Sequence, residues 1–544
     1  MRPSDFPPPW RVDEAIAQPS DDEPIEVDFL VVGAGPAGLA AAIRLGQLAP
    51  DTSVAVLEKG KRPGAHLLSG AVMRPEPLRA LAGEDFPSYG RVPGEAVYFL
   101  TASRAVRIPV PPTMRNHGNV VVSLSQLGRW LAEKAESGGA MLLPETAAVS
   151  LLVDDGRVVG VRTGDKGRGR DGERLGRFEP GSDVRARVTL LCEGTAGHLT
   201  AAALSHFGLQ GSSPQVWALG VKEVWRVARP LRRVIHTLGW PLRAGARYRE
   251  FGGSFVYPMG DDMVALGMVV GLDYRDAELS VHDLLQELKT HPLVRGLLEG
   301  GERVGWGAKT IPEGGFVALP RAFHAPGLLL CGDGVGLVNV PALKGIHYAV
   351  ESGRLAAEAA AGGDLASYDR ALRESFVWED LRGVRNMRQA FAGGFWRGSL
   401  SAGLATVSRG AVPFGDRATE PDADQELFRT DRASAYPQGD GKLTFDKLSS
   451  VFLSGNRTRD DQPNHIRLQT EVPRTLAEMW VRLCPAQVYE LAEPADGDGG
   501  GGAPADRVGV RVTPSNCVQC GAISAKGGRL TPPEGGSGPE YSLT

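Results

Sequence analysis

Apolar residues along this chain gather into short runs that end at glycine turns and precede helical stretches. Residues 29–32 (FLVV) form such a run, and an alanine-rich stretch follows them. Residues 186–200 (ARVTLLCEGTAGHLT) hold an apolar strand that ends at a Glu-Gly turn, and residues 327–359 repeat the order of strand, turn and long helix. Short apolar runs bounded by turns are typical of buried strands. We therefore expect an α/β domain of the Rossmann type.

Between these pieces the pattern changes to strands without intervening helices, at residues 96–100, 105–110, 254–259 and 263–272. They predict an antiparallel sheet that covers the first domain, where a substrate domain usually lies. The expected division is an N-terminal arm over 1–27, a discontinuous cofactor domain over 28–66, 120–200 and 310–387, and a substrate domain over 67–119 and 201–309.

Composition narrows the class of protein. At 544 residues the chain is long enough for several domains, and its 23% of charged residues is ordinary for a soluble globular protein. A net charge of -4 gives no reason to expect nucleic acid as a partner. Five cysteines are too few for a disulfide scaffold and suit a reducing compartment. The proline-rich, acidic arm lacks the composition of a signal peptide or a transit peptide, so we expect it to be a mature end or a short leading arm, and no run of 18 apolar residues occurs.

The first turn carries a phosphate-binding pattern. Gly33, Gly35 and Gly38 form G-x-G-x-x-G between the strand and its helix. The first glycine permits a tight turn, the second lets the backbone approach a pyrophosphate, and the third lets helix and strand pack closely. Glu58 ends the next strand, at the distance expected for an acid that binds the adenosine ribose. The pattern alone is compatible with either FAD or NAD.

A second turn favours FAD. Gly332 and Asp333 follow an apolar strand and precede a long helix. This arrangement resembles the second flavin motif of the glutathione-reductase-like superfamily, in which the aspartate binds the ribityl chain. Cys192 and Cys331 lie in the apolar strands, where a small buried side chain is their expected role.

Near the C-terminus Cys517 and Cys520 form C-x-x-C, and Cys484 precedes a proline. Together with GAHLLSGAV, GGSFVYPM, ALGMVVGLDY, NVPALKGIH, DKLSSVFLSGNRTRDDQPNHIRL, LCPAQVYEL and PPEGGSGPEY, in this order, they make the chain resemble the electron-transfer flavoprotein–ubiquinone oxidoreductase family. The resemblance extends from about residue 28 to the end of the chain.

The resemblance implies that electrons pass from reduced electron-transfer flavoprotein through FAD and a [4Fe–4S] cluster to ubiquinone at a membrane surface. It places Gly33, Gly35, Gly38, Glu58 and the Gly332–Asp333 turn at the FAD. It also places Asn339 beside the flavin and the backbone of Gly252 and Gly253 against the quinone. It implies a small ferredoxin-like iron–sulfur module over 435–544. No side chain is expected to act as a nucleophile, because the cofactors carry the chemistry.

The cysteine set departs from the family pattern of one Cys-Pro and one C-x-x-C-x-x-C. Cys484, Cys517 and Cys520 fill three positions, and Ile523 occupies the fourth. Thiolates are the ligands that iron–sulfur clusters prefer, and the adjacent Ser524 is a poor substitute. Three interpretations remain open: a cluster with three thiolates and a hydroxyl or water ligand, or a three-iron form; loss of the cluster; or a zinc site completed by a residue such as His465.

Residues 388–415 are expected to lie at the membrane surface. Phe391, Phe395, Leu400, Leu404 and Val407 follow helical spacing, with Trp396 nearby and arginines at 388, 397 and 409. A helix packed into the core is the alternative. The polar residues 416–440 separate the flavin body from the module, and the glycine-rich tract 495–506 is expected to loop out.

We therefore predict a peripheral membrane protein on the cytoplasmic face of a bacterial inner membrane. Two other functions remain possible on the sequence alone. One is a cluster-free FAD-dependent reductase or hydroxylase of the geranylgeranyl-reductase-like type, and the other is a non-catalytic scaffold that keeps FAD and zinc.

Overall fold

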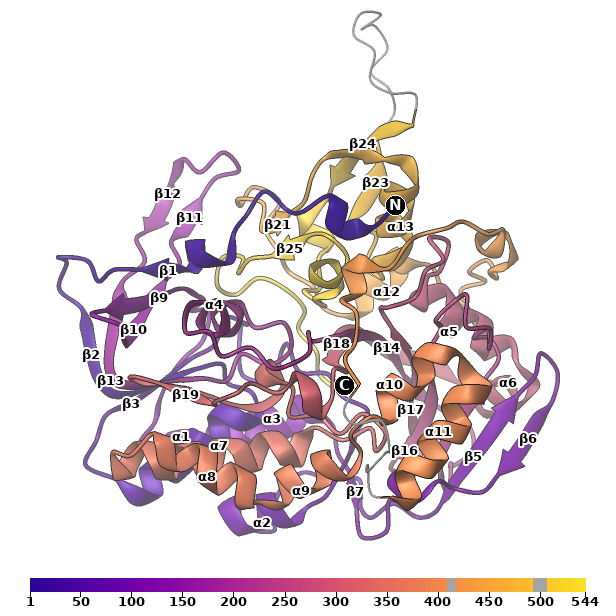
Figure 1. Cartoon of the computed structure of the whole chain (residues 1–544), viewed down its shortest axis with the longest axis horizontal. Coiled ribbons are helices and arrows are strands. Elements are labelled where there is room, and N and C mark those ends of the chain that lie inside the picture. Colours follow the sequence, from indigo (N-terminus) through magenta and orange to yellow (C-terminus); the bar gives the residue numbers. More distant parts are fainter. Residues whose placement is uncertain (409–416, 493–505) are drawn as a thin grey trace, which may run out of the picture.

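The computed structural model describes residues 1–408, 417–492 and 506–544. A mostly parallel sheet forms the body at the lower left of Figure 1. Its strands follow the order β1-β9-β10-β13-β2-β3-β8, and β20 also pairs with β13. The strands are β1 (Ile16–Ala17), β2 (Ile25–Val32), β3 (Val54–Leu57), β8 (Met141–Leu143), β9 (Ala148–Asp154), β10 (Arg157–Thr163), β13 (Asp183–Leu191), β19 (His324–Ala325) and β20 (Leu328–Leu330).

Helices cover this sheet because their small residues permit close contact. A β-carbon added to Gly353 of α7 would lie 2.0 Å from the carbonyl oxygen of Ala37 in α1, so only glycine allows the two helices to approach so closely. The helices of this body are α1 (Pro36–Leu48), α2 (Glu76–Ala82), α3 (Leu124–Ser137), α4 (His198–His206), α7 (Ile346–Gly362), α8 (Ala366–Glu374) and α9 (Phe376–Gly383).

The second sheet has the order β18-β14-β17-β16-β15-β5-β6 and is antiparallel except where β15 runs parallel to β5. Its four strands predicted from sequence are confirmed as β5, β6, β16 and β17. The strands are β5 (Glu95–Leu100), β6 (Ala105–Ile108), β14 (Trp217–Arg226), β15 (Val234–Gly239), β16 (Gly252–Met259), β17 (Met263–Gly271) and β18 (Glu302–Pro312), with α5 (Val281–Thr290) and α6 (Pro292–Leu298) packed nearby.

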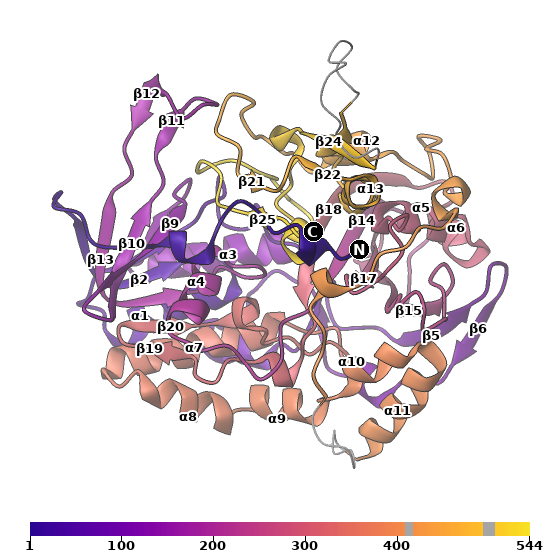
Figure 2. The same cartoon turned by 45° about the horizontal axis from the view of Figure 1, so that its top comes forward.

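The C-terminal module lies across the top of both sheets in Figures 1 and 2. It contains α12 (Lys447–Leu453), α13 (Arg474–Leu483), and the strands β21 (Ile466–Arg467), β22 (Glu471–Pro473), β23 (Tyr489–Leu491), β24 (Arg507–Val512) and β25 (Arg529–Leu530). Its last residues return to the flavin body, where the amide of Ser125 donates to the carbonyl of Thr544 at 3.1 Å. Residues 495–505 of the tract expected to loop out lie outside the described residues.

Two strands cross expected domain boundaries. Strand β2 begins at Ile25, within the arm, and β18 continues to Pro312 in the second sheet, past the expected limit at 310. The arm itself is docked: β1 pairs with β9, and the Trp10 ring lies 5.2 Å from the His198 ring. Short ribbons outside the main sheets are β4 (Val72–Met73) with β7 (Val120–Val121), and β11 (Lys166–Arg168) with β12 (Arg174–Glu179).

Candidate functional site

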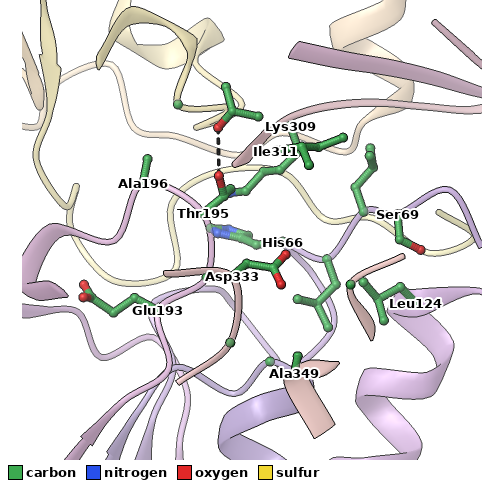
Figure 3. A pocket seen from close by; sticks show the side chains of 18 of the residues that line it. His66, Ser69, Leu124, Glu193, Thr195, Ala196, Lys309, Ile311, Asp333 and Ala349 are labelled. Carbon is green, nitrogen blue, oxygen red and sulfur yellow. Dashed lines mark hydrogen bonds between the residues drawn. The ribbon is translucent and has the colours of Figure 1, made fainter. Parts of the chain in front are cut away.

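A deep cavity lies between the carboxyl ends of the parallel strands and one face of the antiparallel sheet. The loop after β2, the end of β3 and the turn after β20 line one side of it, and residues of β14, β16, β17 and β18 line the other. Figure 3 shows Asp333 and His66 near its centre, with Ser69 on one side and Glu193 on the other. Ligands of open α/β sheets bind in this position, beyond the carboxyl ends of the strands.

The phosphate loop has the conformation that its glycines predict. Gly33 has φ +106°, and a β-carbon on it would lie 2.5 Å from the carbonyl oxygen of Cys192. A β-carbon on Gly38 would lie 2.0 Å from the Gly33 carbonyl oxygen, so the close packing of helix and strand depends on it. Gly35 lines the cavity as the residue before α1, whose free N–H groups face an anion there. This cradle fits a pyrophosphate.

Two partly buried carboxyl groups line the same cavity. The Glu58 carboxylate accepts hydrogen bonds from the amides of Ala34 at 3.1 Å and Gly60 at 2.6 Å, and its burial raises its pKa. Burial raises the pKa of Asp333 to about 6. The long helix predicted after this turn is α7, which begins at Ile346 after a loop that brings its N-cap residue, Gly345, back to the carboxyl group of Asp333.

Asn339 does not point into this cavity. Its side-chain oxygen accepts from the Ala342 amide at 3.1 Å, and its amide nitrogen lies 3.4 Å from the Tyr348 hydroxyl. Its neighbours Val338 and Val340 line the flavin cavity, whereas Asn339 lines a second, polar cavity on the other side of the loop. Asn339 therefore shapes the loop beside the cavity, and a direct contact with the flavin stays a prediction.

Gly252 and Gly253 begin β16 and do not themselves line the cavity, although Val269, the cross-strand partner of Gly253, does. β-Carbons on them would lie 2.0 Å from the Val269 carbonyl oxygen and 2.4 Å from the Thr237 carbonyl oxygen, so neighbouring strands pass very close. The preceding Phe251 has its ring centroid 4.9 Å from that of Phe391, in the segment between α10 (Met387–Ala390) and α11 (Phe395–Val407). The glycine pair thus follows directly after a residue that contacts the segment between these two helices.

The three predicted cysteine ligands come together in the C-terminal module. Cys484 ends α13, and Cys517 and Cys520 lie in the loop after β24. The thiols interact electrostatically with one another, and burial raises the pKa of all three, that of Cys520 to about 12. The amides of Ala486 and Val488 lie 3.4 Å from the Cys484 sulfur, as N–H donors do around thiolates in metal clusters.

The cysteine loop also forms part of the flavin cavity wall. Gln519 and Gly521, on either side of Cys520, line that cavity. The amide of Thr310 in β18 donates to the Cys520 carbonyl at 2.8 Å, and its hydroxyl donates to the same oxygen at 2.9 Å. The Lys309 ammonium donates to the Gln519 carbonyl at 3.1 Å. The cysteine loop is therefore shared by the two candidate cofactor sites, and β18 holds this loop in place.

Comparison with known protein families and sequences agrees with this geometry. Residues 217–311 match the ubiquinone-binding family model of electron transfer flavoprotein–ubiquinone oxidoreductases, residues 441–542 match the 4Fe-4S model of the same proteins, and residues 31–82 match a NAD(P)-binding Rossmann-like domain. The mitochondrial electron transfer flavoprotein-ubiquinone oxidoreductase of Arabidopsis thaliana is 40% identical over 96% of this chain and 85% of its own. The chain belongs to the electron transfer flavoprotein–ubiquinone oxidoreductase family.

Other relatives support the assignment. A probable electron transfer flavoprotein-ubiquinone oxidoreductase of Acinetobacter baylyi is 36% identical over 95% of this chain and 98% of its own. Among solved structures, a geranylgeranyl bacteriochlorophyll reductase-like protein of Thermoplasma acidophilum has a TM-score of 0.54 at 17% identity and covers 72% of this chain and 94% of its own. That likeness concerns the fold alone.

The fourth cysteine position distinguishes this family member. Ile523 is buried, and Gly528 packs against it so closely that a β-carbon there would lie 2.5 Å from its side chain. The hydroxyl of the neighbouring Ser524 accepts a hydrogen bond from the Leu530 amide at 3.1 Å. It is therefore engaged with the backbone of β25. The three predicted cysteine ligands therefore lie together, whereas position 523 carries a side chain that cannot bind metal.

The zinc alternative lacks the geometry that it needs. Within residues 1–408, 417–492 and 506–544, no three His, Cys, Asp or Glu side chains converge as ligands of a single metal ion. The three thiols interact electrostatically with one another, but they do not form such a group. His465 is buried with both ring nitrogens unpaired, and no cysteine acts on its pKa.

The expected membrane-surface segment is divided into two helices. Gly394, with φ +90°, separates α10 from α11. The exposed stripe on α11 is formed by Trp396, Leu400 and Leu404, which are 66%, 72% and 64% exposed. Phe391 and Phe395 instead pack inward, which corrects the predicted stripe. Figures 1 and 2 both place α11 on the side of the molecule opposite the C-terminal module.

The expected position of Arg388 at the membrane surface is also wrong. It is buried, and it pairs with Asp273 and Glu313 at 2.8 Å each, so it anchors α10 to the second sheet and does not reach a lipid headgroup. Residues 409–415 of this segment, including Arg409, lie outside the described residues, as does the side chain of Val407. In the described part of the chain no helix has the length and apolar character needed to cross a membrane.

Sequence reasoning missed three cavity residues: His66, Lys222 and Lys309. His66 is buried with both ring nitrogens unpaired, and a β-carbon on Gly538 would lie 2.8 Å from one of them. Lys222 and Lys309 interrupt apolar strands, and a charged residue in a buried strand was the available signal.

Proposed function

We propose that this protein takes electrons from reduced electron-transfer flavoprotein and passes them, with FAD and a 4Fe–4S-type cluster as resident cofactors, to ubiquinone at a membrane surface. The observation that carries the proposal is the shared wall between the two cofactor sites, because Gln519 and Gly521 of the cysteine loop line the flavin cavity. Electron transfer needs no side-chain nucleophile, but it does need cofactors held close together.

The residues of the cavity fit FAD. The loop at Gly33 and Gly35 and the start of α1 receive the pyrophosphate. Glu58 accepts hydrogen bonds from the ribose, and Asp333 binds the ribityl chain. When bound, FAD supplies both two-electron and one-electron chemistry.

The residues of the module fit a cluster at three of its four corners. Cys484, Cys517 and Cys520 hold it as thiolates, which the Ala486 and Val488 amides and the Lys309 ammonium help to stabilise. At the corner that faces Ile523, the ligand comes from outside the protein or the iron is absent.

The quinone end is expected at Gly252 and Gly253. Both glycines begin β16 beside Phe251, which packs on the segment between α10 and α11. Trp396, Leu400 and Leu404 form an apolar strip on α11 that suits the interfacial region of a bilayer, from which a lipid-soluble quinone enters. We place the protein as a peripheral protein on the cytoplasmic face of a bacterial inner membrane, supported by its likeness to the Acinetobacter baylyi relative.

The cluster-free reductase is the second candidate, and Ile523 is the one observation in its favour. It is less well supported, because residues 441–542 match the 4Fe-4S family model and three buried thiols still gather. The zinc scaffold is weaker still, because no ligand set for a single ion forms among the described residues.

Anaerobic rapid mixing tests the proposal. Reduced electron-transfer flavoprotein should bleach the flavin absorbance, and a short-chain ubiquinone should then restore it. NADPH should not replace the protein donor. Bleaching by NADPH but not by the flavoprotein would establish the cluster-free reductase instead. Bound FAD without iron in oxygen-free preparations would contradict electron transfer through a cluster.

A further inference from the structure

Two neighbouring residues of β14, Lys222 and Glu223, are buried on opposite faces of the second sheet. Successive side chains of a strand point to opposite faces. Lys222 lines the flavin cavity, whereas Glu223 faces α5 and the C-terminal module. Lys222 is 1% exposed and Glu223 is fully buried, so both charges are removed from water.

The charge of Glu223 is fully compensated. Its carboxylate is paired with the Lys289 ammonium at 2.9 Å and with the Arg303 guanidinium at 3.3 Å. The Trp225 indole N–H donates to it at 2.7 Å, and the Gln286 amide lies within 3.3 Å. A buried carboxylate with such partners is a structural ion cluster.

The charge of Lys222 has no such partner. Its ammonium donates to the Ser69 carbonyl at 2.9 Å, and no carboxylate in the described ranges forms an ion pair with it. Burial alone lowers its pKa to about 7. Its cross-strand neighbours are Gly267 and Gly307, which contribute no charge. An isolated buried cation is costly unless a ligand supplies the negative charge.

The occupant of the cavity can supply that charge. The motif residues Gly33 and Glu58 account for the nucleotide and Asp333 for the ribityl chain, so the flavin ring is left with the part of the cavity roofed by β14, β16 and β17. A flavin that takes up two electrons and one proton carries one negative charge. The electrons come from the protein donor and the proton from solvent, so the lysine does not need to give up its own proton.

We infer that Lys222 is the cation that faces the negative charge of the flavin ring in the reduced protein, an inference that rests on the proposed binding of FAD. Lys222 thereby favours reduced over oxidised flavin and sets the potential at which the protein accepts electrons. A purely structural role would be to hold the Ser69 loop through the one hydrogen bond.

Three variants of the full-length holoprotein separate these roles. Lys222→Met removes both the charge and the hydrogen bond, whereas Lys222→Gln removes the charge and keeps an N–H donor for Ser69. Lys289→Met is the matched control, because it removes a buried lysine of α5 that pairs with Glu223 on the other face of the sheet. The readout is the flavin midpoint potential from an anaerobic titration with dithionite and a reference dye, which needs neither donor protein nor quinone.

Both Lys222 variants should lose at least tenfold in the preference for reduced over oxidised flavin, a fall of about 30 mV for a two-electron couple. Lys289→Met should leave the potential unchanged. After removal of FAD, Lys222→Met should unfold at a higher temperature than the unaltered chain, because an unpaired buried charge is gone. An unchanged or higher potential in Lys222→Gln would overturn the inference, whatever its stability.

The outcome is independent of the proposed acceptor. If the potential falls but ubiquinone is not reduced, the role of Lys222 stands and the proposed function fails. If ubiquinone is reduced at the usual rate and the potential does not move, the function stands and the role of Lys222 fails.

Discussion

The flavin site and the cysteine site of this chain are built in different ways. The flavin site is made mainly of backbone: Gly33 and Gly38 are required because a β-carbon at either position would meet a carbonyl oxygen. The cysteine site is made of side chains carried by a loop, and Ile523 replaces one of them without disturbing the buried position. A site made of backbone fails together with the fold, whereas a site made of side chains can change its chemistry while the fold persists.

The first way to break this comparison is to put a side chain into the phosphate loop. Gly33→Ala should destabilise the protein by about 3 kcal/mol and abolish FAD binding, because φ +106° and the Cys192 carbonyl both oppose a β-carbon. Gly35→Ala is the control: its β-carbon would meet only a Leu67 carbon at 3.8 Å, so stability should change by less than ~0.5 kcal/mol while FAD binds more weakly. Urea unfolding and flavin content measure both. Equal destabilisation by the two changes would contradict the backbone argument.

The second prediction compares an exposed apolar surface in each half of the molecule. Leu400 on α11 is 72% exposed and Leu448 on α12 of the module is 50% exposed. Leu400→Glu should weaken binding to anionic phospholipid vesicles by roughly thirtyfold, since burying one leucine contributes about 2 kcal/mol. Leu448→Glu should leave vesicle binding unchanged, because α12 belongs to the module on the far side from α11 (Figure 1). Co-sedimentation measures both, and equal losses would show that the membrane does not meet α11 specifically.

The same contrast explains what the sequence could and could not predict. Some strands of both sheets, the turn at Gly33 and the close packing at Gly38 followed from apolar runs and a spacing rule, and the structure confirms them; β14, β15 and β18 of the second sheet were not predicted. The inward packing of Phe391 could not be read from helical spacing, because Gly394 ends that spacing before α11 begins, and Phe395 of α11 packs against Phe99, a residue far away in sequence. Spacing shows that a face is apolar, but only the tertiary contacts decide which apolar residues meet solvent.

Charged residues in the interior were harder to predict. Lys222, Lys309 and Arg388 all occur where a single sequence shows only an interruption in an apolar or amphipathic pattern. Arg388 was expected at the membrane because its partners, Asp273 and Glu313, are more than 70 residues away along the chain. Electrostatic pairing over such separations has no local signal, so its sites appear only once the sheets are assembled.

The third prediction restores the missing side chain of the cysteine site. Ile523→Cys should raise iron retention against a chelator by about tenfold or more, since even partners outside the first coordination sphere change metal affinity by that amount. Electron paramagnetic resonance of the reduced, anaerobic protein should shift towards a four-iron signal. Ser524→Cys is the matched control and should do neither, because its side chain is directed towards the Leu530 amide. Unchanged iron in Ile523→Cys would count against the three-thiolate set.

The smallest effect concerns acid, to which the two regions respond with opposite signs. Burial lowers the pKa of His465 in the module to about 3 and raises the pKa of Asp333 in the flavin site to about 6. Below pH 6.5 the unfolded chain protonates the histidine and the folded chain does not, so its contribution to stability is complete above that pH and falls on acidification. The folded chain takes up the aspartate proton first, so Asp333 contributes stability at low pH that is lost as the pH rises through 6.

Variants should therefore separate the two titrations between pH 7.5 and 5.5. Between pH 7.5 and 5.5, His465 lowers the free energy of unfolding of the intact chain by about 1.4 kcal/mol. His465→Leu should remove this decrease. Asp333→Asn should instead increase the decrease in unfolding free energy by somewhat under about 1 kcal/mol. The reason is that the stabilisation which Asp333 provides on acidification disappears. Urea unfolding of the FAD-free protein at the two pH values measures both changes. If both variants changed the pH dependence of stability in the same direction, His465 and Asp333 would not have the opposite pKa shifts on which this comparison depends.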